Sequence, residues 1–131
     1  MRFMMLMIPN IPVAQEDWMP DAEDVARMGR YNEELAKAGV LLALDGLHPP
    51  ASGARVTFGE GGVTVKDGPF TEAKEVIGGY WLIDVSSREE AVEWARRIPG
   101  APGNVVEVRR VFEMSDFPED VQAAAGDLQL P

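Results

Sequence analysis

Three apolar runs constrain the fold of this chain more than any other feature. They are Phe3 to Ile8, Val40 to Leu44 and Tyr80 to Val85. Polar residues hardly interrupt them, whereas a strand that faces water on one side would alternate. Each run therefore predicts a β-strand that is buried on both faces. None approaches the ~20 apolar residues of a membrane-spanning helix. A fold built on these strands must cover both sides of its sheet.

Two segments between these runs have helical periodicity. The first predicts a helix from about Asp21 to Ala38 that stops at Gly39, a residue suited to the left-handed backbone that ends helices. The second predicted helix begins after Ser86 or Ser87 and stops at Pro99. The apolar stripe of the first helix comprises Val25, Met28, Tyr31 or Asn32, and Leu35.

A β-hairpin is predicted between the second and third runs. Ala54 to Phe58 and Val63 to Lys66 are its expected strands, joined by a glycine-rich turn. Val105 to Phe112 predicts the last strand. The resulting order is strand, helix, strand, hairpin, strand, helix, strand. This is the split βαβ plan of a ferredoxin-like α+β fold with an inserted hairpin.

Right-handed crossovers place both helices of such a plan on one face of the sheet. The other face then has no helix to cover it, apart from a short one expected at Pro118 to Ala125 in the acidic tail. A second copy of the chain is the simplest cover, since two-fold dimers are the commonest oligomers. We therefore expect a homodimer with two packed sheets, a dimeric α+β barrel. Residues 1–112 would form this domain, and residues 113–131 the tail.

Composition excludes several classes of function. The 131 residues suit one domain. There are 22 acidic and 12 basic side chains and a net charge of −10, so nucleic acids and anionic membrane surfaces would repel the chain. Without cysteine there is no disulfide, no thiolate metal site and no cysteine nucleophile. The apolar start stops at Pro9 with no cleavage site after it, so we expect a cytoplasmic protein without a signal peptide.

The densest cluster of functional residue types follows the hairpin. Asp67-Gly68-Pro69-Phe70 forms a predicted turn, and Glu72 and Lys74 come directly after it. One interpretation is a stiff, solvated loop tied by salt bridges. The other is a polar ligand site made by the crowded charges, with Phe70 as an apolar wall. Residue types alone favour the first.

His48, the single histidine, stands on a rigid loop before Pro49-Pro50. If this loop faces Asp67, the two side chains would form a general-base pair. The alternative is a histidine in solvent. Trp18 on the first loop is a further candidate pocket wall. The scattered carboxylates have no metal-ligand spacing, so we expect neither a metal nor a cofactor. Gly78-Gly79 predicts a close backbone approach or a bulge, and not a phosphate loop.

The central motif resembles the signature of the DGPF proteins in the YCII-related superfamily. The resemblance implies a ferredoxin-like dimer with a cleft between the sheet, the hairpin loop and the partner. The wider superfamily resembles isomerases, dehydrochlorinases and cofactor-free oxygenases that use a histidine–aspartate pair. In simpler members that histidine stands near the start of the first helix, where this chain reads Asp21-Ala22-Glu23-Asp24. The matching residues are Asp67-Gly68-Pro69-Phe70-x-Glu72-x-Lys74-Glu75, Gly78-Gly79, Ala38-Gly39, Gly46-Leu47-x-Pro49, Ile98-Pro99 and Val106 to Arg109.

These observations favour a homodimer that binds a small polar or aromatic molecule in a cleft at the Asp67–Phe70 turn. His48 and Asp67 are the candidate acid–base residues. The candidate ligand contacts are Phe70, Glu72, Lys74 and Trp18. The sequence leaves open whether the protein is an enzyme. The alternative function is a non-catalytic regulatory or interaction module that acts as a homodimer.

Overall fold

The computed structural model describes residues 1–10, 19–68, 70 and 76–126. Its elements are β1 (Arg2–Ile8), α1 (Ala22–Lys37), β2 (Leu41–Gly46), β3 (Ala54–Gly59), β4 (Gly62–Asp67), β5 (Gly79–Asp84), α2 (Arg88–Arg96), β6 (Val105–Arg110) and α3 (Glu119–Ala125). Single 3-10 turns lie at Pro50–Ser52 and Met114–Asp116. In the described part of the chain, no helix combines the length and the hydrophobicity that a membrane crossing requires.

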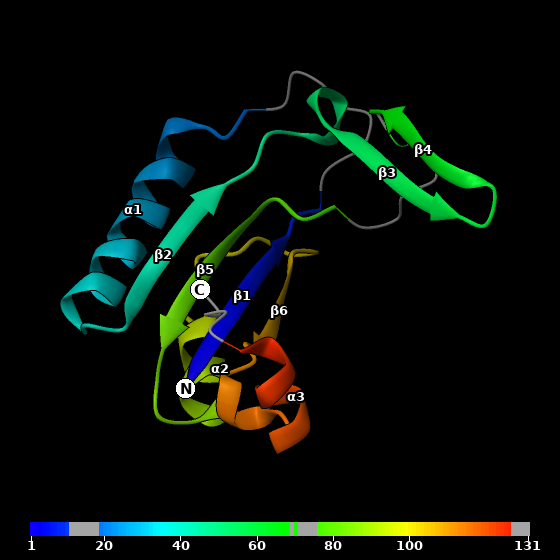
Figure 1. The fold of residues 1–131 in the computed structure, drawn as a ribbon. Helices are drawn as coiled ribbons and strands as arrows, with labels where there is room; N and C mark the ends of the chain where they lie inside the picture. Colours follow the sequence, from blue (N-terminus) through cyan, green and yellow to red (C-terminus); the bar gives the residue numbers. More distant parts are fainter. Residues whose placement is uncertain (11–18, 69, 71–75, 127–131) are drawn as a thin grey trace.

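Four strands form an antiparallel sheet in the order β2-β5-β1-β6, and β3 and β4 form a separate hairpin (Figure 1). Because β5 lies between β2 and β1, the two βαβ halves interleave as the split plan predicts. The predicted α+β class and the inserted hairpin are therefore confirmed. The last strand ends at Arg110, two residues earlier than expected, and the second extends to Gly46.

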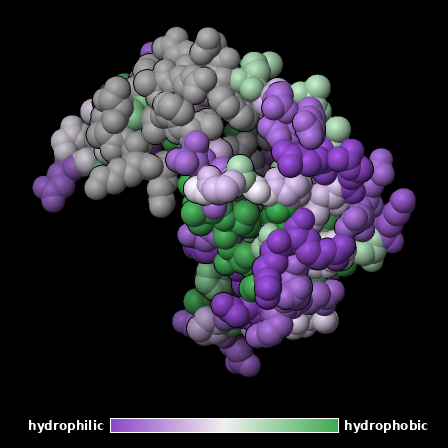
Figure 2. Space-filling model, turned by 180° about the vertical axis from the view of Figure 1, so that it is seen from behind, coloured by the Kyte–Doolittle hydropathy of each residue, from purple (hydrophilic) through white to green (hydrophobic). Residues whose placement is uncertain are grey.

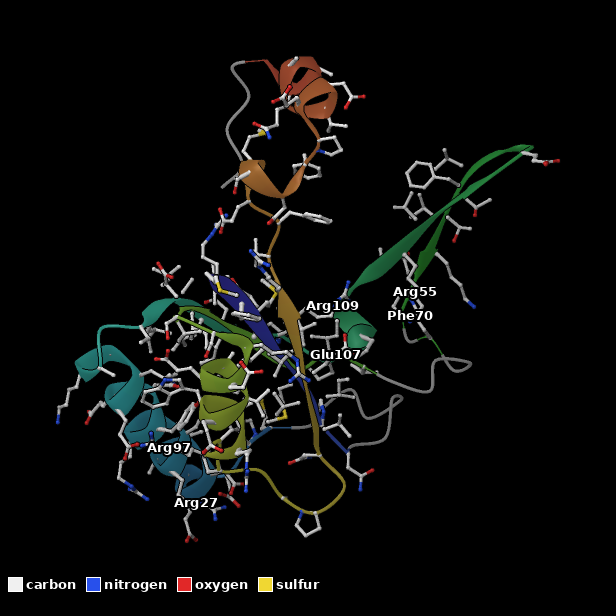
Figure 3. All side chains as sticks on the ribbon, turned by 90° about the horizontal axis from the view of Figure 1, so that it is seen from below. Arg27, Arg55, Phe70, Arg97, Glu107 and Arg109 are labelled. Carbon is white, nitrogen blue, oxygen red and sulfur yellow. The ribbon has the colours of Figure 1, made fainter. Side chains whose placement is uncertain are left out.

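Helices α1 and α2 cover one face of the sheet, as the view along the strands shows (Figure 3). Phe3 and Met5 of β1 point to this face, where they are opposite Ile83 and Trp81 of β5. All four side chains are buried in the core, together with Tyr31, Leu35, Val85, Ala91 and Ile98. This burial holds the helices to the sheet, at about 25 cal/mol for each Å² of apolar surface removed from water.

Capping fixes the ends of both helices. Asp21 caps α1 by accepting a hydrogen bond from the Asp24 backbone N–H, and Gly39 follows the helix with a φ of 75°. Ser87 caps α2 by accepting from the Glu90 N–H. One expectation was wrong, because Val25 of the predicted apolar stripe is 55% exposed. It lies one turn before Met28, the first residue of α1 that packs against the core.

The opposite face of the sheet has an apolar centre. Met4 is paired with Leu82 there, and Leu6 with Tyr80, and all four side chains are partly exposed. Leu42, at the irregularity where β2 shifts register against β5, is 50% exposed. We call this side of the sheet, away from α1 and α2, the open face. Helix α3 lies on this side, but it stands away from the strands (Figure 3).

The C-terminal segment is fastened to β1 by an ion pair. The Arg2 guanidinium donates from Nε to Glu113 Oε1 at 2.8 Å and from Nη2 to Oε2 at 3.1 Å. Phe112 and Phe117 stack beyond it with ring centroids 4.8 Å apart. The hydrogen bonds from Arg2 lower the pKa of Glu113. The short helix expected in the tail is present as α3.

This lowered pKa predicts a pH-dependent stability. A carboxylate whose pKa is depressed by folding stabilises the protein above its unfolded pKa of about 4.3, and the effect is lost as pH falls through the folded value. Glu113→Gln should therefore lower the melting temperature at pH 7, and the difference from wild type should shrink as pH falls below about 4. Glu60→Gln, at the hairpin turn, is the matched control. A Glu113→Gln difference that stays the same size from pH 7 down to the lowest pH at which the protein is folded would contradict the prediction.

Candidate functional site

The site is built at the end of the sheet where β1 and β2 finish and β5 begins. Gly78 donates its N–H to the Met7 carbonyl at 2.8 Å, and Leu47 donates to the Gly78 carbonyl at 2.9 Å. Gly79 is buried opposite Gly46, and a Cβ on Gly79 would lie 2.9 Å from the Asp45 carbonyl oxygen. The predicted close backbone approach at Gly78-Gly79 is therefore confirmed. It draws three chain segments together at this edge.

Gly68, directly after β4, packs against the loop that follows β2. The Gly68 N–H donates to the Gly53 carbonyl at 2.9 Å. A Cβ on Gly68 would lie only 1.9 Å from the Pro50 carbonyl oxygen, so this contact has room for glycine alone. The φ of Gly68 lies outside the left-handed region. The need for glycine at this position is therefore steric and comes from the nearness of Pro50.

Phe70 is an anchor at the base of the hairpin. It is 5% exposed, and the Arg55 guanidinium lies 4.2 Å from the centre of its ring (Figure 3). A cation over an aromatic face is attracted by the negative charge of that face, by about 0.5–2 kcal/mol according to exposure. This contact joins β3 to the turn. Phe70 lines none of the hollows described below, so its predicted role as a ligand wall stays a prediction.

Gly68 should not accept any side chain. Gly68→Ala is expected to destabilise the protein by roughly 1–3 kcal/mol, the usual cost of forcing atoms into a packed site. Gly61→Ala is the matched control, because a Cβ there meets nothing within 4 Å. Urea unfolding of both variants would measure the difference. Equal stabilities of the two variants would show that the Pro50 contact does not constrain Gly68.

His48 lines a small hollow of about 100 Å³ at the same edge of the sheet. It is an exposed residue, and no described residue forms a hydrogen bond or ion pair with its ring. Asp67 ends β4 opposite Ala54. Among the described residues no hydrogen bond joins Asp67 to His48, so their acid–base pairing stays a prediction. The other lining residues of this hollow are Met7, Pro9, Leu47, Pro49, Val76, Ile77 and Gly78.

Trp18, Glu72 and Lys74, the other predicted ligand contacts, lie outside the described residues. The helical turn expected at Thr71–Glu75 lies there too. In the parts of the chain that the structure does describe, no group of three or more His, Asp or Glu side chains could hold a metal ion.

A much larger hollow, of about 700 Å³, lies on the helix side of the sheet. It is bounded by α1 from Asp24 to Asn32, the end of β1 and the loop of residues 99–104. Hydrophobic surface is visible in the middle of the molecule from this side (Figure 2). Its volume is within the 300–1,000 Å³ of typical ligand sites. Its apolar lining includes Met7, Met28 and Pro99, and its polar lining includes Asn10, Asn32, Asn104, Asp24 and Arg27.

Met7 belongs to both of these hollows and to a third, of about 200 Å³, which also contains Met28 and Asn32. The third hollow reaches Asp45 and Tyr80. There the Tyr80 hydroxyl donates to Asp45 Oδ2 at 2.9 Å, and this bond raises the pKa of Tyr80. The three hollows therefore adjoin one another around Met7. We call them together the Met7 cleft.

The orientation of Asn32 is fixed by Trp81. The indole Nε1–H can only donate, and it donates to Asn32 Oδ1 at 2.8 Å. The amide group of Asn32 therefore presents its N–H₂ elsewhere, and no described residue accepts from it. Because Asn32 lines two hollows of the Met7 cleft, it offers hydrogen-bond donors to a bound molecule.

A buried aromatic group holds Trp81 and thus Asn32 in place. Tyr31 meets Trp81 edge to face, with ring centres 6.0 Å apart, and meets Trp94 at 6.4 Å. The Tyr31 hydroxyl donates to the Trp94 carbonyl at 2.7 Å. Burial raises the pKa of Tyr31, so this hydroxyl stays neutral.

At the mouth of the large hollow Arg27 pairs with Asp24, and both are about half exposed.

The Met7 cleft was not predicted from the sequence. One feature of the sequence could have indicated it. In the apolar stripe of α1, either Tyr31 or the polar Asn32 could occupy the inward position. A polar side chain on the inward stripe of a helix needs a hydrogen-bond partner. The N–H of a buried tryptophan, which can only donate, is a suitable partner for the Asn32 oxygen. The partner lies 49 residues away in the sequence, so the pairing becomes visible only in the fold.

Comparison with known proteins identifies the family. A model of the YCII-related domain matches residues 1–115, so the chain belongs to the YCII-related family and the resemblance seen in the sequence is confirmed. An uncharacterized protein of Rhizobium meliloti (strain 1021) is 38% identical over 74 residues. That match covers 56% of this chain and 60% of the Rhizobium protein. Because this relative is uncharacterized, it indicates no activity for the chain described here.

Proposed function

We propose that this protein is a homodimer that binds a small molecule in the Met7 cleft. The observation that supports this most is the fixed Asn32 amide, with its donors on an otherwise largely apolar hollow of about 700 Å³. An apolar or aromatic body would pack on Met7 and Met28. A carbonyl or carboxylate oxygen would accept from Asn32. A small number of well-positioned polar groups on an apolar lining is typical of ligand sites.

Gly68 lies close to the loop that lines part of this cleft. Gly68 packs on Pro50, and the same loop carries His48, whose hollow shares Met7 and Pro9 with the large one. A ligand cleft at the Asp67–Phe70 turn, as the sequence predicts, would therefore adjoin the Met7 cleft. If the bound molecule also reacts, His48 is the described residue placed to exchange a proton with it, because its ring is free of protein partners among those described.

Asn32→Asp tests the proposed donor directly. Aspartate keeps an oxygen for the Trp81 N–H but replaces the N–H₂ by a second oxygen that repels a carboxylate. Benzoate binding should weaken at least about 10-fold, the value of one lost charge-assisted hydrogen bond. Binding of benzamide, which carries its own donors, should suffer less. The Trp81 indole N–H signal in NMR titrations is the readout.

Ala123→Asp is the matched control, because it adds the same charge on the exposed side of α3. It should leave benzoate binding unchanged. If neither benzoate nor any other aromatic or aliphatic acid in a millimolar panel shifts the Trp81 signal of the wild type, the proposed ligand class is wrong. If Asn32→Asp binds benzoate as well as wild type, the donor is elsewhere.

The open face supports the dimer, and with it the dimeric α+β barrel. Met4, Leu6 and Leu82 form an apolar centre that α1 and α2 do not cover. A sheet face of this kind is typically packed against another layer. The same observation favours the alternative function, a regulatory or interaction module that needs no ligand. The two functions differ in the Met7 cleft, which only the first one uses.

Two aspartate substitutions separate folding from assembly. Met5 has no exposed surface, so Met5→Asp should prevent folding by placing a charge in the core. Leu42 is 50% exposed, so Leu42→Asp should leave the fold intact and weaken the dimer. Sedimentation velocity and circular dichroism would record the two outcomes. A wild-type protein that is monomeric at micromolar concentration would contradict the dimer.

A further inference from the structure

The hairpin of β3 and β4 has an apolar face that the described chain does not cover. Val56 is paired with Val65, and Phe58 with Val63. Because these pairs are two residues apart along each strand, all four side chains lie on one side of the hairpin. They are 52%, 67%, 81% and 59% exposed. We call this side the hairpin face.

The other side of the hairpin is polar. It carries the pairs Thr57–Thr64 and Arg55–Lys66. Such a strict division between an apolar and a polar side is the pattern of a strand pair with one buried side. Yet every residue of β3 and β4 is exposed. A two-stranded hairpin alone is marginal in water, so this pattern requires a partner surface.

Two contacts among the described residues hold the hairpin at its base. Arg55 covers the Phe70 ring there, and the Gly68 N–H donates to Gly53. From this base the hairpin extends as an arm to the open-face side of the sheet, away from α1 and α2 (Figure 3). A second copy that covers the open face would therefore also lie beside the arm.

We propose that the hairpin is an arm that grips a second copy of this chain through the hairpin face. The inference deepens the proposed function and rests on the dimer within it. In this dimer the open face forms one part of the interface, and the arm forms a second part. In a two-fold dimer each chain extends one arm, so every contact occurs twice.

Charge supports a second copy as the occupant. The chain has a net charge of −10, which opposes self-association. Residues 54–67 contain two cations, Arg55 and Lys66, and two anions, Glu60 and Asp67, so the arm is neutral. The whole net charge therefore lies outside the arm. A neutral apolar arm is the part of this chain that another acidic copy approaches with least repulsion.

The exposed area also suits a dimer. Phe58 and the three valines leave roughly 400 Å² of apolar side chain on each arm, given the 150–250 Å² that an aromatic residue can bury. Two arms, each against an equal area of partner, would bury about 1,600 Å² in total. This is the usual size of a specific, stable interface.

Phe58→Asp and Thr57→Asp form the test pair, because they are neighbours on opposite sides of the arm. Phe58→Asp should raise the dimer dissociation constant at least about 100-fold, since the charge enters a central contact twice. Thr57→Asp should change it less than about threefold. Sedimentation velocity of the full chain over a dilution series measures both. If Phe58→Asp lowers the folded circular dichroism signal, Phe58→Thr replaces it, since threonine favours strands.

An unchanged dissociation constant for the Phe58 variant would overturn the arm while leaving a dimer through the open face. A monomeric wild type would overturn both. Ligand binding in the Met7 cleft is measured separately in the same samples, from the change of the Trp81 indole N–H signal when benzoate is added. This cleft is lined by one chain, so a folded Phe58→Asp monomer should still bind benzoate. If the wild type does not bind benzoate, the ligand proposal alone is contradicted.

Discussion

The structure depends on strands that are apolar on both faces. Phe3 and Met5 alternate with Met4 and Leu6, so β1 presents a hydrophobic surface in both directions. Helices α1 and α2 bury the first set completely, and this burial organises the core. The second set forms the open face. The proposed dimer and the proposed arm both follow from this imbalance, because one chain has more apolar surface than helices to cover it.

Glycine decides where the candidate site lies. Gly68 and Gly79 each approach a neighbouring backbone so closely that a Cβ would lie within 3 Å of a carbonyl oxygen. These two contacts bring the loop after β2, the base of the hairpin and the start of β5 to one edge of the sheet. Loops at the edge of a rigid scaffold are where binding groups usually lie. The Met7 cleft occupies this edge, and the Tyr31–Trp81 group stiffens it from the core side.

Much of the fold could be predicted from the sequence because its signals are local. Apolar runs located β1, β2 and β5, periodicity and caps located α1 and α2, and the glycine turn located the hairpin. The family was predictable from the long motif around Asp67. Val25 escaped prediction because periodicity does not say how far a helix overlaps its sheet. The reason for Gly68 also escaped, because Pro50 is distant in sequence and meets it only in the fold. The site was less predictable for the same reason: Asn32 and Trp81 meet only after folding, and a turn sequence does not reveal that Phe70 lies beneath Arg55.

The most direct test of this account is an isotope-filtered NOE experiment on a mixture of ¹³C-labelled and unlabelled chains, because it detects only contacts between copies. The account predicts intermolecular signals from methyl groups of Leu6 and Leu82 on the open face and of Val65 on the hairpin face. It predicts none from Leu35, which is fully buried within one chain. Intermolecular signals confined to residues of α1, or their complete absence at a concentration where sedimentation shows a dimer, would contradict it.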